Sequence, residues 1–176
     1  SASWNECTKA TCEEIVKYIR EKNINVYSIH LNRDIGNYLC SSDESIVNRG
    51  YTILKQNLEA VKEMEVKLLV LHLWDTYSEH VDIEGLSRKV YKIAKDYNVT
   101  LTIENIPLSD KNKKIVDVWN ILDNIMPKDY GFTLDLTWCS LYDNFEELIK
   151  FKDRIFNIHI QGKICYLKDD IKLIPR

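Results

Sequence analysis

Apolar residues recur along the chain in two alternating patterns, one typical of amphipathic helices and one typical of strands. A spacing of three and four residues predicts five helices, at about residues 12–19, 53–64, 86–94, 115–125 and 145–149. Compact runs rich in β-branched, aromatic and leucine residues predict five strands, at residues 25–31, 67–73, 99–103, 131–136 and 155–160. Helices and strands in this order imply right-handed crossovers and a parallel sheet, either open and doubly wound or part of a (β/α) barrel.

The two faces of the predicted strands differ, because residues two apart on a strand share a face. One face is entirely large and apolar, and we expect helices to cover it. Its members are Tyr27, Ile29, Leu31, Leu69, Leu71, Leu73, Val99, Leu101, Ile103, Phe132, Leu134, Leu136, Phe156, Ile158 and Ile160. The other face is smaller and more polar, and its last residues are His30, His72, Glu104, Asp135 and His159. A doubly wound sheet would favour apolar residues on both faces, so the asymmetry favours an α/β fold with a partial parallel (β/α) barrel of the TIM type.

These strand-end residues predict a single site, because the C-terminal ends of barrel strands converge. Imidazole and carboxylate groups are ligands that divalent Zn, Mn and Fe accept. Each residue also has an ordinary explanation: a strand-end histidine can close the core, and Asp135 can cap the next helix. Glu104 is the strongest candidate, since a carboxylate that ends a buried run is costly to bury unless it is paired or bound to metal. His80 falls outside this set, and we expect it to be a solvated surface residue.

Composition indicates one soluble domain over residues 1–176, with 45% apolar residues and a net charge of −3. This balance argues against a nucleic-acid or membrane partner. The longest apolar runs, such as 68–73, are far shorter than the roughly 20 residues of a membrane-spanning helix. Five cysteines, an odd number, predict free thiols in a reducing compartment, and we expect a cytoplasmic protein. Cys7 and Cys12 lack a second pair at zinc-finger spacing, which argues against a structural zinc site.

Four short motifs resemble the strand-end motifs of the xylose isomerase-like TIM barrel superfamily. They are Val-Leu-His at 70–72, Leu-Thr-Ile-Glu-Asn at 101–105, Thr-Leu-Asp at 133–135 and Asn-Ile-His-Ile at 157–160. The superfamily contains sugar and sugar-phosphate isomerases and epimerases, and also apurinic endonucleases of the endonuclease IV type. The resemblance implies a barrel of about five to six strands that is shortened at both ends, since a full barrel typically takes ~250 residues.

The resemblance also implies roles for individual residues. Glu104, Asp135 and His159 match the positions that bind a divalent metal, such as Mn or Zn, and Glu104 would also be the catalytic acid and base. His30 and His72 match positions that touch substrate in the sugar enzymes or hold further zinc ions in the endonucleases. For substrate binding we add Trp74 and Trp138, whose rings could stack on a sugar.

Two departures from the family pattern affect the predicted activity. Asp135 is followed by Leu136, Thr137 and Trp138, so the histidine that the family often carries three residues after this Asp is absent. The endonuclease function needs that histidine, so the endonuclease is the weakest of the candidate functions. The segment 169–176 resembles the loop after the seventh strand, and no eighth strand brings the second glutamate used in two-base epimerisation.

The sequence thus leaves two main functions and a weaker third. The first is a divalent-metal-dependent isomerase or epimerase of a sugar or sugar phosphate. The second is a degenerate, catalytically inactive partial barrel that serves as a binding or scaffold domain. Its open strand edges, at 25–31 and 155–160, would be covered by a second copy or another chain. The third is the endonuclease, which should bind abasic duplex DNA in a salt-dependent way.

Overall fold

The computed structural model describes residues 9–78, 81–110, 112–167 and 170–175, and His80 and Cys7 lie outside them. The helices are α1 (Lys9–Glu21), α2 (Asp34–Leu39), α3 (Glu44–Glu63), α4 (Ile83–Asp96), α5 (Ile115–Ile125), α6 (Leu136–Tyr142), α7 (Phe145–Leu148) and the 3-10 helix η1 (Ile149–Arg154). The strands are β1 (Ser28–His30), β2 (Leu68–Leu71), β3 (Thr100–Glu104), β4 (Gly131–Asp135), β5 (Ile155–His159), β6 (Gly162–Leu167) and β7 (Asp170–Pro175). Within these residues, no helix has the length and apolar character that crossing a membrane requires.

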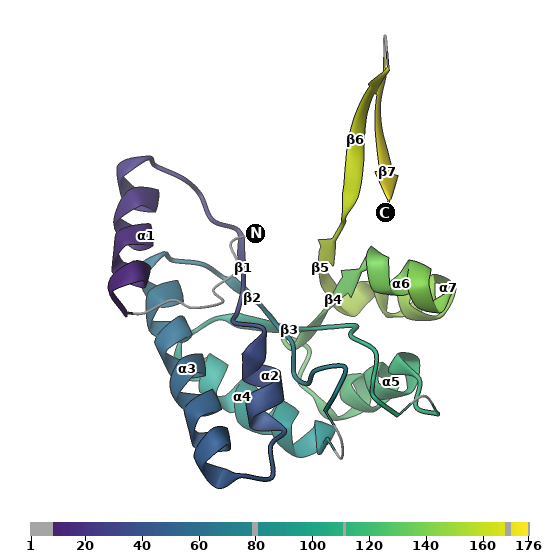
Figure 1. Ribbon diagram of the computed structural model, residues 1–176, viewed down its shortest axis with the longest axis horizontal. Coiled ribbons are helices and arrows are strands. Elements are labelled where there is room, and N and C mark those ends of the chain that lie inside the picture. Colours follow the sequence, from purple (N-terminus) through teal and green to yellow (C-terminus); the bar gives the residue numbers. More distant parts are fainter. Residues whose placement is uncertain (1–8, 79–80, 111, 168–169, 176) are drawn as a thin grey trace.

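Strands β1 to β5 form one parallel sheet in chain order, and the sheet curls into a half-barrel (Figure 1). This confirms the predicted partial TIM-type barrel. Helices α3, α4 and α5 lie along its outer side (Figure 1). In the described chain, β1 and β5 each pair on one side only, so they are the two edges of the half-barrel.

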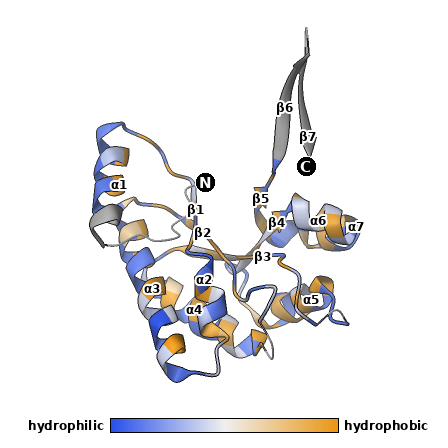
Figure 2. Cartoon of the chain, viewed as in Figure 1, coloured by the Kyte–Doolittle hydropathy of each residue, from blue (hydrophilic) through white to orange (hydrophobic). Residues whose placement is uncertain are grey.

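The predicted apolar face is the core in the middle of the sheet. Leu69, Leu71, Leu101, Ile103, Phe132 and Leu134 are at most 1% exposed and belong to one hydrophobic cluster with residues of the outer helices. Apolar and polar segments alternate around those helices, as their amphipathic patterns require (Figure 2).

The prediction that helices cover the whole apolar face of the strands is wrong at the edges of the half-barrel. Tyr27 is 71% exposed, and Ile158 and Ile160 are 51% and 53% exposed. Each lies at β1 or β5, where no further strand-and-helix unit packs within the described residues. Burial of these positions therefore depends on a neighbouring unit, which the local pattern cannot reveal.

Two short helices, α6 directly after β4 and α2 shortly after β1, were not predicted. The strand expected at 131–136 ends at Asp135, because the Asp135 carboxylate accepts hydrogen bonds from the backbone N–H groups of Thr137 and Trp138 and so begins α6. The other helix, α2, packs behind the end of β2, and its Gly36 faces the backbone of residues 72–74.

The segment 169–176, expected to be a loop, contributes β7 instead. Strands β6 and β7 form an antiparallel hairpin that is separate from the half-barrel sheet and projects beyond β5 (Figure 1). The resemblance to a family loop is therefore not a guide to the local structure here.

Candidate metal centre

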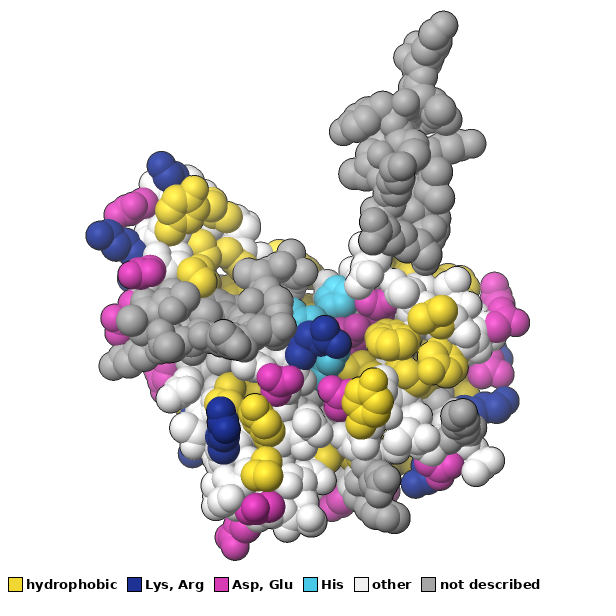
Figure 3. Space-filling model, in the orientation of Figure 1, with side chains coloured by type: hydrophobic (Ala, Val, Ile, Leu, Met, Phe, Trp, Pro, Cys, Tyr) yellow, Lys and Arg dark blue, Asp and Glu magenta, His cyan; other side chains and the backbone are white. Residues whose placement is uncertain are grey.

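All five predicted strand-end residues lie on the same side of the half-barrel. His30, Glu104, Asp135 and His159 are the last residues of β1, β3, β4 and β5, and His72 lies one residue beyond β2. They line a cleft of about 990 Å³ between the two edges of the sheet. Histidine and acidic side chains gather in the centre of the face shown in Figure 3. The strand parity thus identified side chains that the tertiary structure brings together.

Glu104 is the centre of this cluster and is only 3% exposed. Its Oε2 atom lies 3.2 Å from the Nε2 atoms of both His30 and His72. The same oxygen lies 3.1 Å from Nδ1 of His159. Burial alone would raise the pKa of Glu104, but its contacts with the three imidazoles outweigh burial and hold that pKa well below the usual range. Glu104 is therefore a carboxylate at neutral pH.

The protonation of His30 follows from its second nitrogen. Nδ1 of His30 lies 2.7 Å from the backbone oxygen of Leu31, and a carbonyl oxygen can only accept, so Nδ1 carries the hydrogen. In a neutral ring, Nε2 is then a bare lone pair. That lone pair faces the Glu104 carboxylate at 3.2 Å, and this contact between two acceptors is repulsive unless a cation, either a proton on Nε2 or a metal ion, lies between them.

His72 cannot supply that cation at neutral pH. It is buried, and burial lowers its pKa more than the neighbouring Glu104 raises it, so the ring is neutral. Its Nε2 lies 3.0 Å from Nε2 of His30 and 3.2 Å from Glu104 Oε2. A single N–H at Nε2 of His72 would have to serve two acceptors, Nε2 of His30 and Oε2 of Glu104. This hydrogen still leaves no proton between His30 and Glu104.

Asp135 has two roles in the structure. Its Oδ1 caps α6, as the ordinary explanation of the sequence suggested. Its Oδ2 lies 3.8 Å from Nδ1 of His159, the same nitrogen that contacts Glu104. One imidazole nitrogen thus faces two carboxylates.

Hydroxyl groups tie the strands together one layer below the site. Thr102 donates a hydrogen bond of 2.7 Å to the backbone oxygen of Leu69 on β2. Its only hydrogen is then used, so Thr133 on β4 is the donor in the 2.6 Å contact between the two hydroxyls. Both threonines are 0% exposed. This buried chain fixes β2, β3 and β4 against one another directly beneath the strand ends.

The two predicted tryptophans differ in position. Trp138 is half-buried and lines the cleft. Trp74 is 0% exposed and belongs to the hydrophobic core, so it presents no face to a ligand in this structure.

Sequence reasoning missed Arg33 and Asn105. Arg33 is exposed and is the only Lys or Arg among the described residues that line the cleft. Its signal in the sequence was its position three residues after His30. Asn105 follows Glu104 directly, as the last residue of the motif Leu-Thr-Ile-Glu-Asn.

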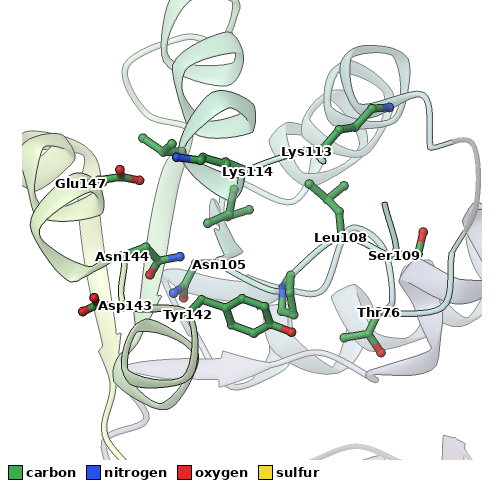
Figure 4. Close-up of a pocket in the computed structure, with 13 residues that line it drawn as sticks. Thr76, Asn105, Leu108, Ser109, Lys113, Lys114, Tyr142, Asp143, Asn144 and Glu147 are labelled. Carbon is green, nitrogen blue, oxygen red and sulfur yellow. The ribbon is translucent and has the colours of Figure 1, made fainter. Parts of the chain in front are cut away.

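A second cavity, of about 640 Å³, lies on the other side of the β3 end (Figure 4). Asn105, Tyr142 and Asn144 lie together on one wall, with Leu108 and Ser109 opposite (Figure 4). None of its lining residues lines the cleft. The adjacent residues Glu104 and Asn105 therefore face two different cavities.

Three side chains of the cleft have the geometry of a metal site. One ligand atom each from His30, Glu104 and His159 lie within 4.8 Å of one another. The predicted set was Glu104, Asp135 and His159. The structure adds His30 to the group, while the assignment of Asp135 remains a prediction that rests on its 3.8 Å distance from His159.

A comparison with protein-family models matches residues 3–164 to the xylose isomerase-like TIM barrel. The chain belongs to this family. No curated protein matches the sequence. The match confirms the resemblance that the four strand-end motifs carried.

Solved structures of this xylose isomerase-like fold show the same architecture at low sequence identity. A D-tagatose 3-epimerase-like protein has a TM-score of 0.66 and 16% identity over 91% of this chain and 64% of its own. The D-allulose 3-epimerase of Methylomonas sp., in complex with D-allulose, has a TM-score of 0.71 and 13% identity over 91% of this chain and 60% of its own. An IOLI protein with a zinc atom has a TM-score of 0.65 and 19% identity over 89% of this chain and 58% of its own. The chain therefore spans less than two thirds of the length of these relatives.

Proposed function

We propose that this chain is a divalent-metal-dependent isomerase or epimerase that acts on a sugar or sugar phosphate. The observation that carries the proposal is the convergence of ligand atoms from His30, Glu104 and His159 to within 4.8 Å of one another, with Nε2 of His30 facing the Glu104 carboxylate at 3.2 Å. The names of the structural relatives, which include tagatose and allulose 3-epimerases, support sugars as the substrate class.

The residues present fit a divalent cation. His30, Glu104 and His159 would hold it, with Asp135 beside His159, and such a mixture of imidazole and carboxylate suits Zn or Mn. When bound, the metal would supply Lewis-acid polarisation of adjacent carbonyl and hydroxyl oxygens. The bond from His30 Nδ1 to a backbone carbonyl is the kind of contact that fixes the tautomer of a metal-binding histidine.

Glu104 has one oxygen for each of two tasks. Oε2 makes the contacts with the three histidines. Oε1 accepts no hydrogen bond from any described residue, so it is the oxygen that we assign to proton transfer at the substrate carbon. A carboxylate with a depressed pKa is a good ligand and a weak base, so proton abstraction depends on acidification of the carbon by the polarised oxygens.

The cleft offers groups that match a sugar. Its volume of about 990 Å³ is at the upper end of typical small-molecule sites. The half-buried ring of Trp138 could stack on the apolar face of a pyranose or open-chain sugar. His72 lies at the inner end, where its neutral imidazole can exchange hydrogen bonds with hydroxyl groups.

The test has a binding arm and a reaction arm. Purified chain, stripped with chelator, is titrated with Mn²⁺ and with Zn²⁺ by calorimetry, and binding of about one ion per chain is expected. The loaded protein is then incubated with D-tagatose, D-allulose and D-fructose in deuterium oxide, and deuterium uptake at carbon is followed by NMR. Absence of metal binding would refute the proposal, whereas binding without exchange would favour the scaffold function.

Two observations favour the second candidate function, a partial barrel that serves as a binding or scaffold domain. The chain spans 58–64% of the relatives named above, and edges β1 and β5 pair on one side only in the described chain. An exposed strand edge favours pairing with another chain. Light scattering tests the predicted homo-oligomer: a dimer without exchange activity supports the scaffold, and an active monomer contradicts it.

A further inference from the structure

The side chain of Asn105 holds the backbone of Asp135 in both directions. Its Oδ1 accepts a hydrogen bond of 2.6 Å from the Asp135 N–H. Its Nδ2 donates a hydrogen bond of 3.1 Å to the Asp135 carbonyl oxygen. Asn105 is 1% exposed, so these bonds are made out of contact with water. Since the N–H can only donate and the carbonyl can only accept, the two contacts fix the orientation of the amide.

This clamp lies where the strand ladder between β3 and β4 stops. The last pair in the register is Glu104 with Thr133, whereas β4 continues to Asp135 and pairs there with His159 of β5. On the β3 side, the Asn105 side chain takes the place of a backbone partner for Asp135. The backbone of Asp135 is therefore held by β5 on one side and by Asn105 on the other.

The Asn105 amide nitrogen makes a second contact. Its Nδ2 lies 3.3 Å from Sγ of Cys139 in α6. Burial raises the pKa of the Cys139 thiol to about 11, so the sulfur is a neutral, weak acceptor. The amide thus joins the end of β3, the end of β4 and the first turns of α6, the helix that Asp135 caps.

We propose that Asn105 is a positioning residue that sets the place of the Asp135 carboxylate in the metal centre. The inference rests on the proposed function, because it assigns to Asp135 a part in metal binding. Oδ1 of Asp135 is held by the helix cap, so the position of the Asp135 backbone sets where Oδ2 lies. Oδ2 lies 3.8 Å from Nδ1 of His159. The adjacent residues Glu104 and Asn105 then have different roles: Glu104 is a metal ligand, and Asn105 positions a second ligand, Asp135.

The substitution Asn105→Leu keeps the approximate size of the side chain and removes both bonds to Asp135. The matched control is Tyr130→Phe, since Tyr130 is 0% exposed, its hydroxyl donates a hydrogen bond of 3.1 Å to Ser87, and neither residue lines the cleft. In chelator-treated protein, hydrogen exchange of the Asp135 and Trp138 amides is followed by NMR. The affinity for Mn²⁺ is then measured by calorimetry.

In Asn105→Leu we expect both amides to exchange at least tenfold faster and Mn²⁺ to bind about tenfold more weakly, the usual effect of losing a group that orients a ligand. Tyr130→Phe should change the Mn²⁺ affinity by less than about twofold, even if it lowers stability as much. If Asn105→Leu does not fold, Asn105→Ser replaces it, because a hydroxyl is too short to span both backbone groups. Unchanged exchange and affinity in the Asn105 variant would overturn the positioning role alone, and so would an equal loss of affinity in Tyr130→Phe. A wild-type chain that binds no divalent ion would overturn the proposed function together with it.

Discussion

The Nε2 atoms of His30 and His72 lie 3.0 Å apart, and each lies 3.2 Å from the same oxygen of Glu104. Nδ1 of His30 is bound to a backbone carbonyl, so the neutral rings offer at most one proton, on His72, to these three atoms. The repulsion among these acceptors is offset when a cation, either a proton or a metal ion, lies among them.

Replacing Glu104 by Gln should abolish tight metal binding. The carboxylate is the shared partner of all three histidines, and an amide has neither its charge nor its second strong acceptor. We expect the affinity for Mn²⁺ to fall by more than about 100-fold, beyond the roughly 10-fold to 100-fold typical of groups that only orient ligands. Calorimetry measures the loss, and the exposed Glu146, changed to Gln, is the control. Retention of wild-type affinity in Glu104→Gln would place the metal elsewhere.

The tautomer of His30 can be measured directly. At pH 8, without metal, we expect Nδ1 to carry the hydrogen and Nε2 to be bare, because Nδ1 lies 2.7 Å from the Leu31 carbonyl. Nitrogen-15 NMR of the imidazoles, assigned with His30→Asn, distinguishes the two nitrogens. Zn²⁺ should then shift the Nε2 resonance and leave the Nδ1–H intact. A ring protonated on Nε2 alone contradicts the geometry described here.

Acid should destabilise the metal-free protein in two pH windows. Burial lowers the pKa of His72 in the folded state, so the unfolded chain takes up a proton first, as the pH falls through about 6.5. The lowered pKa of Glu104 acts in the same direction below about 4.3, because the folded state resists protonation of this carboxylate. Urea unfolding between about pH 8 and pH 3 measures both effects.

The control for this pH dependence is His72→Gln, which removes one of the two groups. It should flatten the stability curve between about pH 6.5 and 5 and leave the lower window in place. A wild-type unfolding free energy that rises on acidification through the upper window would contradict the burial of a neutral His72.

Gly36 should be intolerant of even one methyl group. A Cβ atom there would collide with the backbone oxygen of His72 and would lie 2.8 Å from the backbone nitrogen of Trp74. Backbone cannot move aside without shifting His72, so Gly36→Ala should lower the unfolding free energy by about 1–3 kcal/mol and weaken metal binding. Gly50→Ala is the comparison, since the nearest atoms there belong to the side chains of Tyr38 and Leu39. Equal losses in both variants would show that Gly36 has no special part in placing His72.

The sequence was sufficient for the middle of the fold. The alternation along the chain places Leu69 and Leu71 on one face of their strand and His72 on the other. This needs no tertiary contact, since the backbone of a strand itself points successive side chains to opposite faces. The same reasoning failed at Tyr27 and Ile158, because whether an apolar face is covered depends on a neighbouring unit. It also overextended the strand that ends at Asp135, where a side-chain cap begins a helix.

For the site, the sequence determined which residue types stand at the ends of consecutive strands, and the parallel sheet makes their convergence predictable. Only the tertiary structure decided that His30 joins Glu104 and His159, that Trp74 is buried in the core, and that the Asn105 amide holds Asp135. The physical reason is that distances of about 3 Å between residues tens of positions apart depend on sheet curvature, register and helix packing. A linear pattern specifies the face of a residue, whereas packing specifies which atoms it meets.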